Sequence, residues 1–192
     1  MTDPGTTRPK VSRRLLFGLP LGLLAVGGTG FYILLERMRS GSYNPQAFDN
    51  PLVGHHIPKF SLPGIDHGEG FDAGQLSAMT RPVLVNFFAS WCVPCAGEAP
   101  YLGQLSQSGL DIWGIAYQDK PKALALYLAK YGNPYQRLAA DLSGRTAINW
   151  GVYGVPESFL IAPGGRVTWH MAGPLVPETI HRQLKPALKR IS

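Results

Sequence analysis

Residues 82–95 read PVLVNFFASWCVPC, and this stretch decides the fold. Its first half, Pro82 to Phe88, is a nearly continuous run of apolar, β-forming residues, which is typical of a strand buried on both faces. A short turn follows, and a helix is predicted to begin near Cys92 because Pro94 suits a first helical turn. The stretch therefore predicts a strand, a turn and a helix with Cys92 and Cys95 at its start.

These two residues are the only cysteines among 192 residues. A thiol attacks a disulfide as the thiolate, and the free N–H groups and positive dipole end of a helix start stabilise that charge. We expect Cys92 to attack first, a mixed disulfide to form, and Cys95, one helical turn later, to resolve it. The alternatives are two inert buried thiols or half of a metal site, which would need two more ligands.

The amino-terminal segment is apolar and has a basic flank. Residues 15–35 contain no charged side chain over 21 positions, close to the ~20 that a helix needs to cross a bilayer. Four basic residues precede this run and two follow it. The stronger positive flank is amino-terminal, so the positive-inside rule places residues 1–14 in the cytoplasm. The sequence predicts an inner-membrane anchor at 15–35, a polar linker at 36–50 and a periplasmic domain at 51–192. A cleaved signal peptide is the alternative, and it also exports the domain.

The distribution of charge argues against nucleic-acid binding. The net charge is +6, but residues 1–39 carry +4 of it and residues 40–192 only +2. The excess lies beside the predicted anchor, and the domain shows no basic stripe. We therefore expect no nucleic-acid partner.

The rest of the chain predicts an α/β fold. Strand and helix patterns alternate, then a hairpin around Pro163-Gly164-Gly165 precedes a last helix, which implies a mixed sheet covered by helices on both faces. The expected elements are an edge strand at Ile57–Phe60, strands at Asp111–Tyr117, Glu157–Ile161 and Val167–Ala172, and helices at Pro121–Tyr131 and Pro177–Lys189.

Two sequence blocks carry a family resemblance. Residues 86–95 read NFFASWCVPC and precede Glu98, and residues 150–161 read WGVYGVPESFLI. These blocks resemble the thioredoxin superfamily and, within it, the membrane-anchored cytochrome c maturation thioredoxins of the CcmG or DsbE type. The resemblance implies a thioredoxin-like mixed β-sheet flanked by helices, one N-terminal transmembrane helix, and a redox-active disulfide between Cys92 and Cys95.

The resemblance also assigns roles to residues away from the cysteines. Pro156 would be a cis-proline that faces the cysteines, and Val155 would offer its backbone to an incoming peptide strand. Glu98 would belong to an acidic active site and exchange protons with Cys95; the alternative is an ordinary acid in an early helical turn. Asn86 replaces the buried aspartate of cytosolic thioredoxins, so their proton relay is not transferred to this chain.

Two further residues are predicted to bind substrate. Trp91 would cover the cysteines and form part of the contact surface, the alternative being core packing. Glu157 would add negative potential near the thiols and disfavour the thiolate; the alternative is a solvated residue at a strand end.

The resemblance implies a protein-disulfide reductase that needs no cofactor and no metal. Its target would be a disulfide of apocytochrome c or of a cytochrome c maturation protein, and a membrane electron donor of the DsbD or CcdA type would reduce it again. A general periplasmic oxidant or isomerase is one rival. A peroxidase would need a Thr-x-x-Cys pocket, which is missing here. A metal carrier would need a third ligand from the five histidines, which are His55, His56, His67, His170 and His181.

Overall fold

The structure is a computed structural model that describes residues 26–33, 35–36, 50–65 and 68–191. Contacts divide the chain into two units, residues 1–46 and 47–192. In the first unit, residues 26–33 and 35–36 are helical. Within the described ranges, no helix is both long enough and apolar enough to cross a membrane. The predicted cytoplasmic segment and most of the predicted anchor and linker lie outside the described residues.

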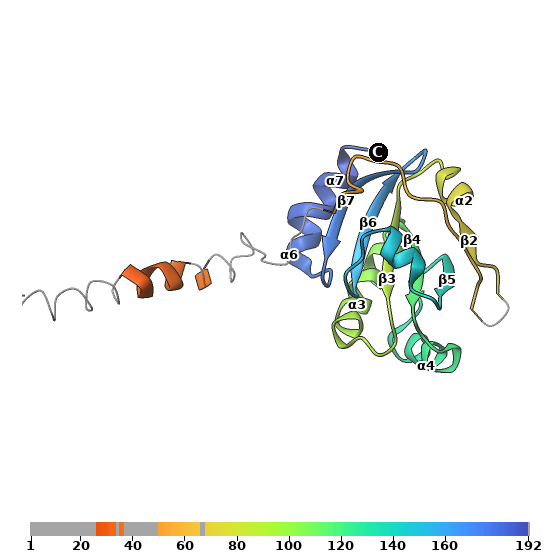
Figure 1. Cartoon of the computed structure of the whole chain (residues 1–192), viewed down its shortest axis with the longest axis horizontal. Coiled ribbons are helices and arrows are strands. Elements are labelled where there is room, and N and C mark those ends of the chain that lie inside the picture. Colours follow the sequence, from red (N-terminus) through yellow and green to blue (C-terminus); the bar gives the residue numbers. More distant parts are fainter. Residues whose placement is uncertain (1–25, 34, 37–49, 66–67, 192) are drawn as a thin grey trace, which may run out of the picture. The chain divides into compact units, whose positions relative to one another are not determined.

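A five-stranded mixed sheet organises the second unit (Figure 1). The order across the sheet is β5-β4-β3-β6-β7. Strands β3, β4 and β5 pair in parallel, β6 pairs antiparallel with β3, and β7 pairs antiparallel with β6. This arrangement confirms the predicted mixed sheet. The strands are β3 (Val83–Phe88), β4 (Asp111–Tyr117), β5 (Arg137–Asp141), β6 (Glu157–Ala162) and β7 (Arg166–Ala172).

The two faces of the sheet contact different apolar clusters. All six residues of β3 are buried, and its side chains alternate between the faces. Leu84 and Phe88 pack with both cysteines and with residues of α3 (Val93–Gln107) and α4 (Pro121–Tyr131). Val83 and Phe87 belong to the second cluster, which includes residues of α2 (Ala73–Ser77) and α5 (Arg145–Asn149). The prediction of a strand buried on both faces is therefore confirmed.

The predicted edge strand at Ile57–Phe60 is wrong. These residues form no strand; His56 makes an isolated bridge to Arg166, and a short strand begins only at Ser61. Pro58 has no N–H to give to a ladder, which fits the break. The short strands β1 (Ser61–Leu62) and β2 (Phe71–Asp72) pair antiparallel beside α2.

The carboxyl-terminal helix is not continuous. It consists of α6 (Pro177–Thr179), a π-helical segment η1 (Ile180–Leu184) and α7 (Lys185–Lys189). Pro186 cannot donate to the carbonyl four residues earlier, and a wider turn just before it accommodates the missing hydrogen bond. The predicted helix over Pro177–Lys189 is thus present as three joined pieces.

Candidate active site at the Cys92–Cys95 disulfide

Four chain segments meet at one edge of the sheet. The register pairs Phe88 with Ala116 and Tyr117 with Asp141, so the parallel strands β3, β4 and β5 end together. The antiparallel β6 starts at this same edge, because Glu157 pairs with Phe87. Segments that leave or enter these strand ends therefore converge, as is common at the carboxyl edge of parallel strands.

The cysteine pair lies at the start of α3, which follows β3. Cys92 is the N-cap residue and Cys95 lies in the first turn; their sulfurs form a disulfide. The Cys92 Sγ accepts a hydrogen bond of 3.1 Å from the Cys95 backbone N–H. Cys92 is 4% exposed and Cys95 is fully buried. Cys92 is therefore the sulfur that an outside thiol or disulfide can reach, and it lies where helix N–H groups stabilise a thiolate.

The turn before Cys92 is held by Asp119, which follows β4. The Asp119 carboxylate accepts hydrogen bonds from the Ser90 backbone N–H and, at 2.7 Å, from the Ser90 hydroxyl. It also accepts the Lys120 N–H at 2.7 Å. Sequence reasoning missed this residue, because nothing local to Asp119 indicates that it meets a turn 29 positions earlier.

The loop before β6 lies against Cys92. The Val155–Pro156 peptide bond is cis, as predicted, and Pro156 is buried. The Val155 carbonyl oxygen lies 3.4 Å from the Cys92 Sγ. In the reduced protein this oxygen can accept a hydrogen bond from the Cys92 thiol. The structure therefore brings together the cysteines, Val155 and Pro156, as the resemblance implied.

Glu98 lies on the cysteine side of the sheet and is 1% exposed. Its Oε1 accepts a hydrogen bond of 3.0 Å from the Asn86 amide, and its Oε2 accepts one of 2.8 Å from the Leu175 backbone N–H. Burial raises the pKa of Glu98 from 4.5 to about 7, although both hydrogen bonds act in the opposite direction. A carboxyl with this pKa exchanges protons readily near neutral pH.

A buried polar network extends from Glu98 through Asn86. The Asn86 amide also donates to the Ser158 hydroxyl at 3.1 Å, and its carbonyl accepts from the Tyr135 hydroxyl at 2.9 Å. Burial raises the pKa of Tyr135, so its hydroxyl stays a proton donor. Tyr127 on α4 donates a hydrogen bond of 2.9 Å to the Cys95 carbonyl. The first turn of α3 is thus fixed from a neighbouring helix.

Glu157 lies on the other face of the sheet. It pairs with Phe87 in the register, and both Phe87 and Phe159 belong to the cluster opposite the cysteines. Its side chain is 3% exposed, and its Oε2 lies at hydrogen-bond distance, 2.7 Å, from the His170 Nε2. Glu157 is neither a solvated strand-end residue nor a neighbour of Glu98, because strand alternation directs it away from the thiol side.

Three exposed apolar side chains are close to the disulfide along the chain: Trp91 and Val93 flank Cys92, and Tyr153 lies two residues before Val155. Trp91 is 58% exposed, Val93 82% and Tyr153 79%. The Trp91 ring lies 6.4 Å from that of Tyr117, between centroids. Core packing does not account for Trp91. Large apolar residues exposed beside a reactive sulfur suit contact with a polypeptide.

Metal ligands do not gather in the part of the chain that the structure describes: no group of three or more His, Cys, Asp or Glu could hold an ion there. His170 is engaged by Glu157, and His67 lies outside the described residues.

Comparisons with known proteins agree with this geometry. The Redoxin family model matches residues 52–185. Thiol:disulfide interchange protein HelX of Rhodobacter capsulatus is 35% identical over 179 residues, 93% of this chain and 97% of HelX. DsbE of Escherichia coli K12, with the same descriptive name, is 32% identical over 180 residues, 94% of this chain and 97% of DsbE. A solved thiol-disulfide oxidoreductase of Bacteroides fragilis has a TM-score of 0.56 and 26% identity over 68% of this chain and 98% of that one.

A helix-start cysteine pair beside a cis-proline, on a mixed sheet of this order, defines a thiol-disulfide oxidoreductase of the thioredoxin fold. Such an enzyme moves two electrons between dithiols and disulfides. The chain belongs to the Redoxin family and, within it, to the DsbE-type thiol:disulfide interchange proteins.

Proposed function

We propose that the protein is a membrane-anchored periplasmic reductant for disulfides of apocytochrome c or of a cytochrome c maturation partner. The observation that carries the proposal is the Cys92 sulfur, the less buried of the two, at a helix start and 3.4 Å from the Val155 carbonyl oxygen. The cytochrome substrate is supported by the resemblance to the CcmG or DsbE type. Export and anchoring are supported by the apolar run at 15–35 and its basic amino-terminal flank.

The exchange proceeds in two balanced steps. In the reduced protein, the Cys92 thiolate attacks one sulfur of the substrate disulfide, and the other substrate sulfur leaves as a thiolate. Cys95 then loses its proton and attacks the Cys92 sulfur, which releases the second substrate thiol and forms the Cys92–Cys95 disulfide. The substrate gains two electrons that the two cysteines lose. A membrane electron donor of the DsbD or CcdA type would return them.

The position of Glu98 favours a protein that reduces its substrate over one that oxidises it. It lies one helical turn beyond Cys95 and, when ionised, its negative charge disfavours a nearby thiolate. A strong oxidant is one whose reduced form is unusually stabilised, and a buried acid on the same helix acts against such stabilisation. Glu98 also provides a group that can take the proton from Cys95 before the second step.

Trapping tests the substrate. In the full-length chain, Cys95→Ala prevents the second step, so mixed disulfides through Cys92 persist and can be identified by mass spectrometry. We expect an apocytochrome c or a maturation protein to be captured, and Cys92→Ala as the matched control to capture none. Capture of many unrelated exported proteins would instead support a general oxidant or isomerase. A reduction potential as high as about −120 mV, typical of a strong oxidant, would exclude the reductant.

A further inference from the structure

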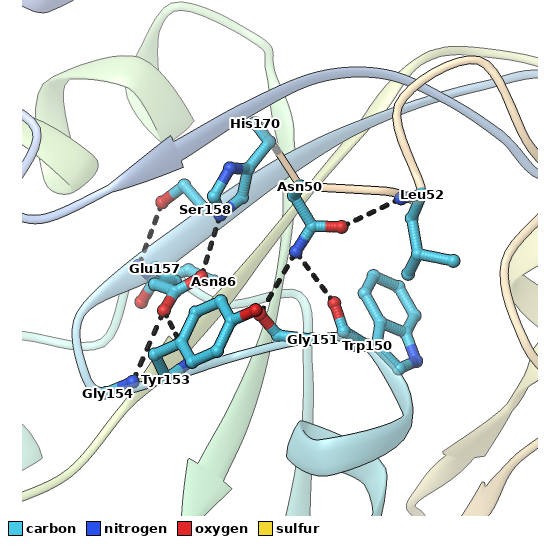
Figure 2. A network of polar contacts seen from close by, with 10 residues as sticks. All are labelled: Asn50, Leu52, Asn86, Trp150, Gly151, Tyr153, Gly154, Glu157, Ser158 and His170. Carbon is cyan, nitrogen blue, oxygen red and sulfur yellow. Dashed lines mark hydrogen bonds and ion pairs between the residues drawn. The ribbon is translucent and has the colours of Figure 1, made fainter. Parts of the chain in front are cut away.

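The hydrogen-bonded pair of Glu157 and His170 takes no direct part in the exchange, yet it is buried beside the active-site loop (Figure 2). The Glu157 Oε2 and His170 Nε2 atoms lie 2.7 Å apart, and the side chains are 3% and 7% exposed. Burying a carboxylate is unfavourable unless its oxygens are hydrogen-bonded.

The second oxygen of Glu157 holds the loop backbone. Its Oε1 accepts a hydrogen bond of 2.8 Å from the Tyr153 N–H and one of 3.2 Å from the Gly154 N–H. Figure 2 shows both bonds converging on the one carboxylate, with His170 on its other oxygen. The carboxylate thus joins β6 and β7 to the two residues that immediately precede Val155.

The position of those two residues sets the position of Val155. Its carbonyl lies 3.4 Å from the Cys92 sulfur, and an extended peptide that pairs with its backbone would bring a disulfide to that sulfur. Tyr153 and Gly154 are exposed, and each donates its backbone N–H to the Glu157 carboxylate. A backbone segment that pairs with an extended partner binds best when its shape is fixed beforehand.

We propose that Glu157 and His170 are positioning residues: Glu157 fixes Tyr153 and Gly154 so that Val155 is ready to dock a peptide disulfide, and His170 orients the Glu157 carboxylate. The proposal rests on the proposed function, and within it on the expectation that Val155 offers its backbone to the substrate peptide. It departs from the sequence-based expectation that Glu157 itself touches substrate, because its carboxylate lies on the sheet face opposite the cysteines.

Two substitutions of Glu157 distinguish the effect of losing the hydrogen-bond acceptor from the effect of changing the side-chain volume. Glu157→Gln keeps an oxygen that can accept from both N–H groups and an amide that can donate to a neutral His170. Glu157→Met has similar volume and no such oxygen, so both N–H groups lose their acceptor. His170→Phe keeps a ring against Phe159, whose centroid lies 4.6 Å from that of His170, and removes the hydrogen bond to Glu157.

The test compares two substrates of the full-length protein, which is reduced beforehand and freed of reductant, in single turnovers at a series of substrate concentrations. The concentration that gives half the maximal rate is the KM and the maximal rate is the kcat compared below. One is a synthetic peptide with an internal disulfide, and the other is 5,5′-dithiobis(2-nitrobenzoic acid), which has no backbone to pair with Val155. For the peptide we expect Glu157→Met to raise KM about tenfold and His170→Phe about threefold, with kcat within about twofold of wild type. Glu157→Gln should stay within about threefold of the wild-type KM. Rates with the small disulfide should be unchanged in all variants.

The double variant Glu157→Met with His170→Phe tests whether His170 acts through Glu157. If His170 acts through Glu157, adding His170→Phe to Glu157→Met raises KM no further. Unchanged peptide KM in both single variants, or equal losses on both substrates, would overturn the positioning role. If Glu157→Met does not fold, His170→Phe alone decides by the same criterion. A wild-type protein that reduces the small disulfide but no peptide would overturn peptide docking itself, which is a distinguishable result.

Discussion

Glu98 shows how one buried side chain couples the chemistry of the site to the stability of the domain. Its carboxyl lies between Asn86 and the Leu175 N–H with 1% of the residue exposed. Burial raises its pKa to about 7. A group whose pKa is higher in the folded state than in the unfolded chain binds its proton more tightly when folded, so folding is favoured at low pH and less so at high pH.

We expect the stability contributed by Glu98 to be fully present below pH 4.5 and to be lost as the pH rises through about 7. Across this interval the free energy of unfolding should fall by about 3 kcal/mol through this group. Urea unfolding of the oxidised protein at a series of pH values measures this change. Glu98→Gln cannot ionise, so its curve should lack the decrease; parallel curves for both proteins would contradict the assignment.

At the scale of elements, the start of α3 is positioned by the end of β4. Asp119 accepts three hydrogen bonds, two from Ser90 and one from the Lys120 N–H. Ser90 lies two residues before Cys92, so these bonds set the angle at which the chain enters the helix. The reactivity of Cys92 depends on that entry, because its sulfur must lie over the free N–H groups of the first turn.

Asp119→Ala should lower the free energy of unfolding by about 2 kcal/mol, because three partly buried donor groups lose their acceptor. It should also slow alkylation of Cys92 by iodoacetamide at neutral pH about threefold, since a thiol less well placed over the helix start has a higher pKa. Urea unfolding and single-turnover labelling of the reduced protein provide the two measurements. Ser90→Ala is the matched control and should lose about 1 kcal/mol, because only the hydroxyl bond is removed. Wild-type labelling in Asp119→Ala would contradict this role.

At the scale of the whole molecule, Asn50, the first described residue of the second unit, forms a hydrogen bond with the backbone of a residue 100 positions later in the chain. Asn50 is 3% exposed, donates to the carbonyls of Trp150 and Gly151 at 2.8 and 3.2 Å, and accepts the Leu52 N–H at 2.9 Å (Figure 2). The sequence placed Asn50 at the end of a polar linker, whereas its contacts make it part of the folded domain.

Asn50→Ala should destabilise the protein by about 2 kcal/mol, because the buried Trp150 carbonyl and the partly buried Gly151 carbonyl lose a donor and the Leu52 N–H loses an acceptor. Asn50→Asp separates the two effects. It keeps the acceptor for Leu52 but directs negative charge at two carbonyl oxygens, so it should destabilise at least as much as the alanine variant at pH 7. Urea unfolding checks both variants, and an aspartate variant as stable as wild type would show that the carbonyl contacts contribute nothing.

The sequence alone determined the strand-turn-helix unit with Cys92 and Cys95 at the helix start. It also determined the bounds of β4 and α4, because each is specified by local periodicity and by proline and glycine signals. The short helices and strands were not predicted from the sequence. The capping box of Asp72 and Gln75, which starts α2, is one local signal that could have been recognised.

Only the tertiary structure decided how the side chains around the disulfide are shared between the two faces of the sheet. Glu98 and Glu157 are both acids near the motif. Glu98 lies on the same face of the sheet as the cysteines, and Glu157 lies on the opposite face. The partners of Asp119 and Asn50 are likewise distant in sequence. Such contacts depend on which strands are neighbours and in what register, and a one-residue shift of register would exchange the faces. That information exists only once the chain has folded.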